Sequence, residues 1–277
     1  DYFVQLIPNE TNDSSMPLFD YGFFNKSEDV IKGSKSSYYP VSLVKVIEKI
    51  KNTEGRYAIT GVPCFIKTLR LLAQNDSILK DRIKFTVGIV CGGMKSANQA
   101  KMIGWELGVE PKHLTSIDFR RKYKDRPASQ KIYQVWSNND NKERYENANL
   151  IYGTDYGAGL FKPKACDYCD DVVGELAVVS VGDAWLDQFR NDPQGTSLII
   201  VRNPKILQLL YDSFNNDKIE LTEITTQEAG DSQSGGFRHR REGLSYRLNK
   251  LKKNKEWYPE KRVKPKEFKI SKKRQII

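Results

Sequence analysis

The chain has 277 residues, which is long enough for one large domain or two modest ones with a real hydrophobic core. Its 39% hydrophobic and 29% charged residues are typical of a globular protein in water, and no apolar run approaches the ~20 residues that a membrane helix needs. No signal-peptide pattern is present and four cysteines are too few for a secreted disulfide scaffold, so we expect a cytoplasmic protein with reduced thiols.

The net charge of +10 belongs to the C-terminal end of the chain. From Phe237 onward 16 Lys and Arg stand against 4 Asp and Glu, whereas residues 1–236 carry 29 against 31. We therefore divide the chain into a body, 1–236, and a basic helix with an irregular tail, 237–277, which we interpret as a solvated face and a flexible end. Nucleic acid, an anionic membrane surface and an acidic protein are alternative partners, but the tail's aromatic residues are too sparse for a typical nucleic-acid reader.

The apolar pattern predicts alternating strands and helices. Strands are expected at 1–8, 56–60, 84–90, 115–120, 131–136, 176–181, 196–202 and 218–224, and helices at 41–52, 65–73, 96–107, 204–214 and 237–255. Residues 9–27 and 137–147 are expected to be polar loops. This order predicts an α/β fold, with a mixed, mainly parallel central sheet, flanking helices, and a basic C-terminal helix and tail.

The four cysteines follow this pattern. Cys64 comes between a predicted strand and a helix, Cys91 ends the next predicted strand, and Cys166 and Cys169 form a C-x-x-C. Two parallel strands would carry Cys64 and Cys91 to the same edge of the sheet. The count fits one four-thiolate site, held by zinc or by an iron-sulfur cluster, although a single cysteine is more often a small buried hydrophobe. Structural zinc usually shows two close pairs, so one close pair favours a cluster.

A small-residue loop at Gly33-Ser34-Lys35 offers main-chain amides and one cation, which can hold a phosphate. The loop lacks the glycine spacing of either common nucleotide fingerprint, so an ordinary loop is the alternative interpretation.

Seven short motifs occur in a familiar order. They are Gly33-Ser34-Lys35, Thr60-Gly61-Val62-Pro63-Cys64, Gly88-Ile89-Val90-Cys91, Asp118-Phe119-Arg120-Arg121-Lys122, Cys166-x-x-Cys169-Asp170, Gly182-Asp183-x-Trp185 and Gly195-Thr196-Ser197. The series resembles the β-subunit family of coenzyme F420-reducing hydrogenases and dehydrogenases, which includes the reductase of 7-hydroxymethyl chlorophyll. The resemblance runs from about Gly33 to Arg241, some three quarters of the chain.

The resemblance implies an iron-sulfur flavoprotein oxidoreductase. Family members hold FAD in the α/β domain with a [4Fe-4S] cluster close to it. Electrons pass between cluster and flavin one at a time, and the flavin exchanges a hydride with an organic acceptor such as a deazaflavin. The implied partners are a ferredoxin or another electron-transfer protein or subunit, and a small organic electron acceptor or donor; a nucleic acid and a membrane span are not expected.

The resemblance also assigns roles to residues of this chain. The cluster ligands would be Cys64, Cys91, Cys166 and Cys169. The flavin contacts would be Gly33, Ser34, Lys35, Thr60, Gly61, Val62, Pro63 and Asp183, with a simple turn aspartate as the alternative for Asp183. Arg120 and Lys122 would be the catalytic candidates, facing the flavin or an anionic substrate.

Two departures leave other functions open. Many family members begin with a ferredoxin-like module and a glycine-rich flavin-binding stretch. Neither is found in this sequence, and we expect the chain to be truncated at its N-terminal end. A zinc-stabilised binding module with a nucleic-acid-contacting tail is one alternative. An accessory protein that bears the cluster but no flavin is the other.

Overall fold

A computed structural model describes residues 1–155 and 157–267 of the chain, which places the last ten residues of the predicted tail outside the described part. A six-stranded sheet forms its centre, in the order β2-β1-β3-β4-β8-β9. Its strands are β1 (Tyr2–Pro8), β2 (Phe19–Phe24), β3 (Tyr57–Gly61), β4 (Ile83–Ile89), β8 (Val179–Asp183) and β9 (Ser197–Val201). The four inner strands are parallel, and β2 and β9 pair antiparallel at the two edges. The predicted mixed, mainly parallel sheet is therefore confirmed.

Three helices bury the first core against this sheet. They are α2 (Val44–Asn52), α3 (Pro63–Asn75) and α4 (Ser77–Arg82). Val46 and Ile50 of α2 are fully buried because they recur at helical spacing on one face, and Ile59 of β3 meets them from the sheet. Pro63 occupies the first turn of α3, where its missing N–H costs nothing, so the helix begins directly after the strand.

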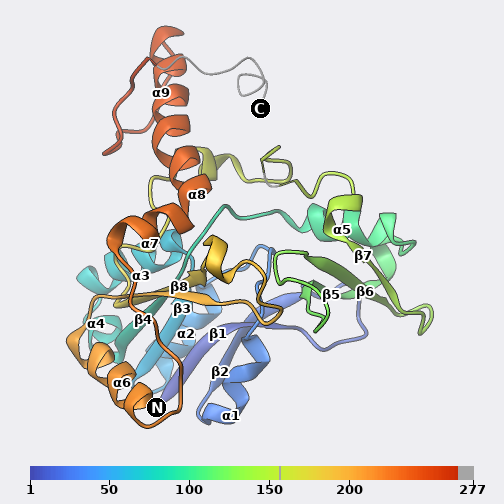
Figure 1. Cartoon of the computed structure of the whole chain (residues 1–277), viewed down its shortest axis with the longest axis horizontal. Helices are drawn as coiled ribbons and strands as arrows, with labels where there is room; N and C mark the ends of the chain where they lie inside the picture. The colour runs from blue at the N-terminus through green and yellow to red at the C-terminus, as the bar shows by residue number, and fades with distance from the viewer. Residues whose placement is uncertain (156, 268–277) are drawn as a thin grey trace.

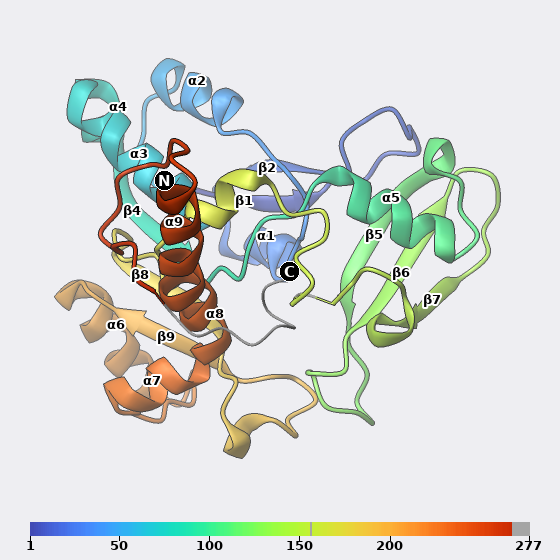
Figure 2. The ribbon, with the colours of Figure 1, turned by 90° about the horizontal axis from the view of Figure 1, so that it is seen from above.

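A second, antiparallel sheet carries its own core. It consists of β5 (Leu114–Arg121), β6 (Ile132–Ser137) and β7 (Arg144–Asn147), with helix α5 (Ala97–Glu106) packed against it. Ile103, Phe119 and Val135 are buried in this core. Phe19 of β2 belongs to the same cluster, which ties the two sheets together. Figures 1 and 2 show this sheet at the opposite end of the molecule from α3 and α4.

The C-terminal part is helical. After α6 (Pro204–Asn215) come α7 (Thr226–Ser232), α8 (Ser234–Arg238), a π-helical turn η6 (His239–Gly243) and α9 (Leu244–Lys253). The predicted helix over 237–255 is thus present but interrupted by the π turn. Figure 1 shows α9 extending away from the main sheet. No helix of the described residues is long and apolar enough to cross a membrane.

Three sequence predictions were wrong. The supposed loop of residues 9–27 contains β2, whose alternating Phe19, Tyr21 and Phe23 carry a strand pattern that the polar flanks obscured. The loop of 137–147 ends in strand β7, which pairs with β6. Residues 218–224 form no strand, because this mostly exposed segment finds no partner edge for its alternating pattern within the described part of the chain.

A glycine should be needed at position 182, where β4 and β8 end. An ideal Cβ at Gly182 would stand 2.5 Å from Cβ of Val90, the residue before Cys91. We expect Gly182→Ala to lower the free energy of unfolding by about 1–3 kcal/mol, because the strand ends must move apart. Gly230→Ala in α7 is the control: apart from its chain neighbours and its own helix backbone, no described atom lies within 4 Å of its ideal Cβ, so it should stabilise by about 0.5–1 kcal/mol. Urea unfolding measures both, and equal effects would contradict the packing argument.

Candidate metal and flavin site

The parallel strands β3, β4 and β8 end at one edge of the main sheet, where α/β folds bind their ligands. Cys64 lies in the first turn of α3, directly after β3, and Cys91 follows β4. Asp183 is the last residue of β8. The two separated cysteines thus stand at neighbouring parallel strand ends, as their positions in the sequence predict.

The other three cysteines affect the pKa of the Cys64 thiol. Burial first, and then repulsion from Cys91, Cys169 and Cys166, raise its pKa to about 11. Cys64 keeps part of its surface exposed, yet protein surrounds its sulfur closely enough for burial to be the main cause. The N-terminus of α3 would favour a thiolate, and here burial and thiol repulsion outweigh it. All four cysteines therefore belong to one group.

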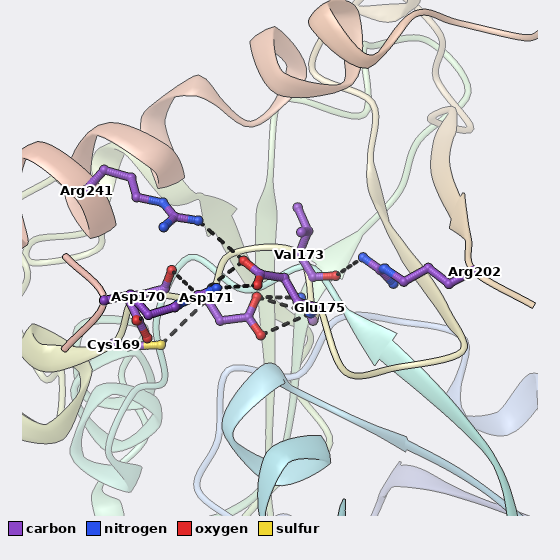
Figure 3. A network of polar contacts seen from close by, with 9 residues as sticks. Cys169, Asp170, Asp171, Val173, Glu175, Arg202 and Arg241 are labelled. Atoms are coloured by element: carbon purple, nitrogen blue, oxygen red, sulfur yellow. Dashed lines mark hydrogen bonds and ion pairs between the residues drawn. The ribbon is translucent and has the colours of Figure 1, made fainter.

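The C-x-x-C is formed by a short 3-10 helix, η4 (Lys164–Tyr168), which contains Cys166. The Cys166 amide donates to the Pro163 carbonyl at 2.9 Å, and the Cys169 thiol donates to the Asp171 carbonyl at 3.5 Å. Figure 3 shows Cys169 beside Asp170 and Asp171. The Cys91 amide donates to the carbonyl of Val172, three residues after Cys169, at 2.9 Å, so the end of β4 is tied to the loop that follows the C-x-x-C.

The spacing of these side chains differs from that of a single-ion site. Among residues 1–155 and 157–267, no three His, Cys, Asp or Glu side chains are grouped closely enough to hold one metal ion. Ligands to one zinc ion converge to about 2–2.3 Å from it. The thiolates of a four-iron cluster each bind a different iron, so such a site spreads its sulfurs more widely.

The basic C-terminal helices pack onto the cysteine site. Arg240 donates to the Cys91 carbonyl at 2.8 Å, with the Cys91 sulfur 3.6 Å away. Arg247 donates to the Asp167 carbonyl, inside the C-x-x-C, at 2.9 and 3.0 Å. The interpretation of this segment as a solvated face is therefore wrong for residues 240–248, whereas residues 252–257 are exposed as expected.

Two more arginines hold the strand connection after the C-x-x-C. Arg262 pairs with Asp170 at 3.1 Å and with Glu175 at 2.6 Å, and Arg241 pairs with Glu175 at 3.3 Å. These carboxylates hold the pKa of Arg262 well above its usual range. Figure 3 shows Arg241 pointing toward Glu175 across the loop. Part of the tail's positive charge is thus paired with the acidic residues that follow the second cysteine.

The predicted catalytic residues are engaged within the protein. Arg120, at the end of β5, is 7% exposed, and its Nη1 lies 2.7 Å from both carboxylate oxygens of Asp183. Its guanidinium also lies 5.8 Å from the Trp185 ring, while its Nε has no hydrogen-bond partner among the described residues. Lys122 donates to the Gln194 carbonyl. Arg120 therefore links the second sheet to the end of β8.

The predicted flavin loops lie next to strands of the main sheet. A Cβ at Gly33 would stand 2.6 Å from the Gln5 side chain and from the Leu6 carbonyl, so glycine lets this loop approach β1. Lys35 forms an ion pair with Asp118 of β5. Thr60, at the end of β3, donates to the Val4 carbonyl at 3.3 Å. Ser34 follows the short 3-10 turn η1 (Ile31–Gly33), and Gly61 to Pro63 form the turn from β3 into α3.

A comparison with known protein families assigns the chain to one of them. The family model that describes the C-terminal part of the "Coenzyme F420 hydrogenase/dehydrogenase, beta subunit" matches residues 54–227, more than half of the chain. This protein belongs to that family. The family resemblance predicted from the motifs is thereby confirmed, and membership supports an oxidoreductase function. All four cysteines lie inside the match, whereas the Gly33-Ser34-Lys35 loop and Arg240 lie outside it.

The fold of this family member also resembles a solved structure. A chain of the F420-reducing [NiFe] hydrogenase complex from Methanosarcina barkeri, from a xenon-derivative study, aligns with a TM-score of 0.58. The alignment covers 91% of this chain and 80% of that one at 12% sequence identity, so it demonstrates a shared fold. No curated protein sequence matches this chain.

Sequence reasoning about this family member missed the partners of the cysteine segments and of the predicted flavin loop. Arg240 and Arg247 were counted only as tail charge, and Asp118 only as part of a motif. Arg240 is 149 residues from Cys91, and no local pattern signals a contact over that separation. In the sequence, nothing distinguishes Arg240 from the other Lys and Arg residues of the basic segment.

The Arg120–Asp183 pair should be strongly coupled. The two side chains are 9% and 31% exposed, so removing Asp183 leaves a poorly solvated guanidinium. A double-mutant cycle with Arg120→Met and Asp183→Asn should give a coupling free energy of about 1–3 kcal/mol in urea unfolding. The exposed pair Arg190–Asp187, at 64% and 92%, is the control and should couple far more weakly. Similar values for the two cycles would contradict the structural role of the buried pair.

Proposed function

We propose that this chain is an iron-sulfur flavoprotein oxidoreductase in which Cys64, Cys91, Cys166 and Cys169 hold a [4Fe-4S] cluster beside FAD. The observation that carries the proposal is the placement of the four thiols: Cys64 and Cys91 stand at the ends of the neighbouring strands β3 and β4, and the Cys91 amide donates to the carbonyl of Val172, three residues after Cys169, at 2.9 Å. Family membership supports the redox class. No cysteine is left over for another role.

The donor set fits a cluster on chemical grounds. Four thiols that repel one another when ionised need positive charge among them, and bound iron supplies it. Ligands of a cluster each bind a separate iron, so the site does not require three side chains grouped around one ion, and no such group is found among the described residues. Family membership then favours the cluster over the zinc-stabilised module.

The proposed flavin site lies along the same sheet edge. Gly33, Ser34 and Lys35 would hold the flavin from beside β1, and the turn from Thr60 to Pro63, with Asp183 at the end of β8, would hold it from beside the cysteines. The N-terminus of the 13-residue helix α3 and the Lys35 cation favour an anionic pyrophosphate nearby. When both are bound, the flavin and the cluster supply conversion between one-electron and hydride transfer, with an organic acceptor such as a deazaflavin.

Arg120 and Lys122 are our proposed residues for facing the flavin or an anionic substrate. Arg120 is held by Asp183, and its Nε, unpartnered within the described residues, leaves one donor for an acceptor beside it. Lys122 follows β5 by one residue and reaches the Gln194 carbonyl, on the loop between β8 and β9. Arg120 and Lys122 therefore bind the end of β8 and the loop after it, beside the proposed flavin site. This attachment supports a role in orienting the flavin or the substrate.

An electron-transfer partner is part of the proposal. The solved neighbour is a chain of a multi-subunit hydrogenase complex, which supports a partner subunit or a ferredoxin as the source or destination of single electrons. We place this exchange in the cytoplasm.

The cluster is tested by replacing one ligand of the C-x-x-C. Cys166→Ser should abolish bound iron and labile sulfide in anaerobically purified protein, while any bound flavin remains, because serine is a poor ligand for iron and the proposed flavin contacts lie elsewhere. Ala165→Ser, on the exposed neighbouring position of the same turn, is the matched control and should keep both. Iron and sulfide assays with the visible spectrum provide the measurement.

The wild-type sample separates the alternatives. A colourless, zinc-containing protein would overturn the proposal in favour of the binding module. Iron and sulfide without flavin would select the accessory protein that bears only the cluster. Cys166→Ser with wild-type iron content would exclude this residue as a ligand.

A further inference from the structure

A buried cation stands at the cysteine site without an acidic partner in the described part of the chain. Arg240 is 2% exposed and is the largest fully buried side chain of the described residues. Its Nη2 donates to the Cys91 carbonyl at 2.8 Å and lies 3.6 Å from the Cys91 sulfur, whereas its Nε finds no hydrogen-bond partner within residues 1–155 and 157–267. The ion pairs formed by neighbouring arginines of that part, such as Arg241, do not extend to Arg240.

Such a placement is unfavourable unless an anion compensates it. A guanidinium is always charged in proteins, and burying an unpaired charge costs far more than a carbonyl hydrogen bond returns. A sulfur that can carry negative charge, that of Cys91, lies 3.6 Å from the Arg240 Nη2. The arginine therefore points to negative charge at the cysteine sulfurs.

The backbone conformation around Arg240 directs its side chain toward Cys91. Arg240 lies in the π-helical turn His239–Gly243, and π turns within helices often occur at functional sites. Leu244 and Leu248, both buried, fix α9 directly after the turn. One helical step along, Arg241 already faces outward to Glu175. The turn thus separates one inward-facing cation from an outward-facing one.

We propose that Arg240 is a positioning and charge-compensating residue that raises the reduction potential of the cysteine-bound cluster. This inference rests on the proposed function. A cluster with four thiolate ligands is anionic and gains one further negative charge when one electron reduces it. A fixed guanidinium beside one ligand sulfur favours the more negative, reduced form. The protein thereby sets how readily the site accepts an electron.

The test is a reductive titration of the full chain with dithionite and redox mediators, followed by visible and electron paramagnetic resonance spectra. Arg240→Gln should lower the equilibrium constant for one-electron reduction at least tenfold, a shift of about 59 mV toward lower potential. Arg240→Lys keeps the charge and should shift the potential less. Arg238→Gln removes the same charge from an exposed position two residues away and should change the constant less than about twofold.

Each outcome decides between explanations. A tenfold effect for Arg240→Gln alone supports the inference, as does loss of iron from Arg240→Gln with retention in Arg240→Lys. A cluster that stays intact in Arg240→Gln with an unchanged reduction potential would overturn the inference. Loss of iron from both Arg240 variants would also overturn it, because the contact with the Cys91 carbonyl would then be purely structural. A wild-type protein without iron and sulfide would overturn the proposed function itself, and this inference with it.

Discussion

The delivery of four cysteines to one end of the parallel strands is the constraint around which this structure is arranged. Burial raises the pKa of Cys64 and the other three cysteines add to the rise, so isolated loops would not keep such groups together. Rigid parallel strands do so here, because β3 and β4 end side by side and deliver Cys64 and Cys91 to one edge. The close approach of Gly182 to Val90 keeps the adjoining strand end in place.

The C-terminal helices complete this site. The cations of this segment look like a solvated surface when they are counted along the sequence, but Arg240, Arg247 and Arg262 reach Cys91, Asp167 and Asp170 respectively. Arginine suits this task because its planar fork can satisfy several carbonyl or carboxylate oxygens at once. The net positive charge of the chain thus serves partly to surround a site that becomes anionic when its thiols ionise.

The second sheet contributes by a buried ion pair and an aromatic contact. Arg120, one residue before the end of β5, holds Asp183 at the end of β8, so the antiparallel sheet is joined to the edge that carries Cys64 and Cys91. Phe19 provides the apolar counterpart, since it belongs to the core of the second sheet while lying in β2 of the first. These two contacts fix the relative placement of the two sheets around the proposed flavin site.

The sequence by itself determined the alternation of strands and helices and the position of each cysteine at a strand end or in a tight turn. Local period and the Pro63 helix start carry that information within a few residues. It could not determine that β2 pairs with β1, that residues 218–224 stay unpaired, or that Arg240 meets Cys91. Strand pairing and burial depend on whether a segment distant in the sequence lies alongside. Two segments with the same alternating pattern can therefore differ, one paired in a sheet and the other exposed to solvent. Only the tertiary structure decided which of many arginines became the buried one.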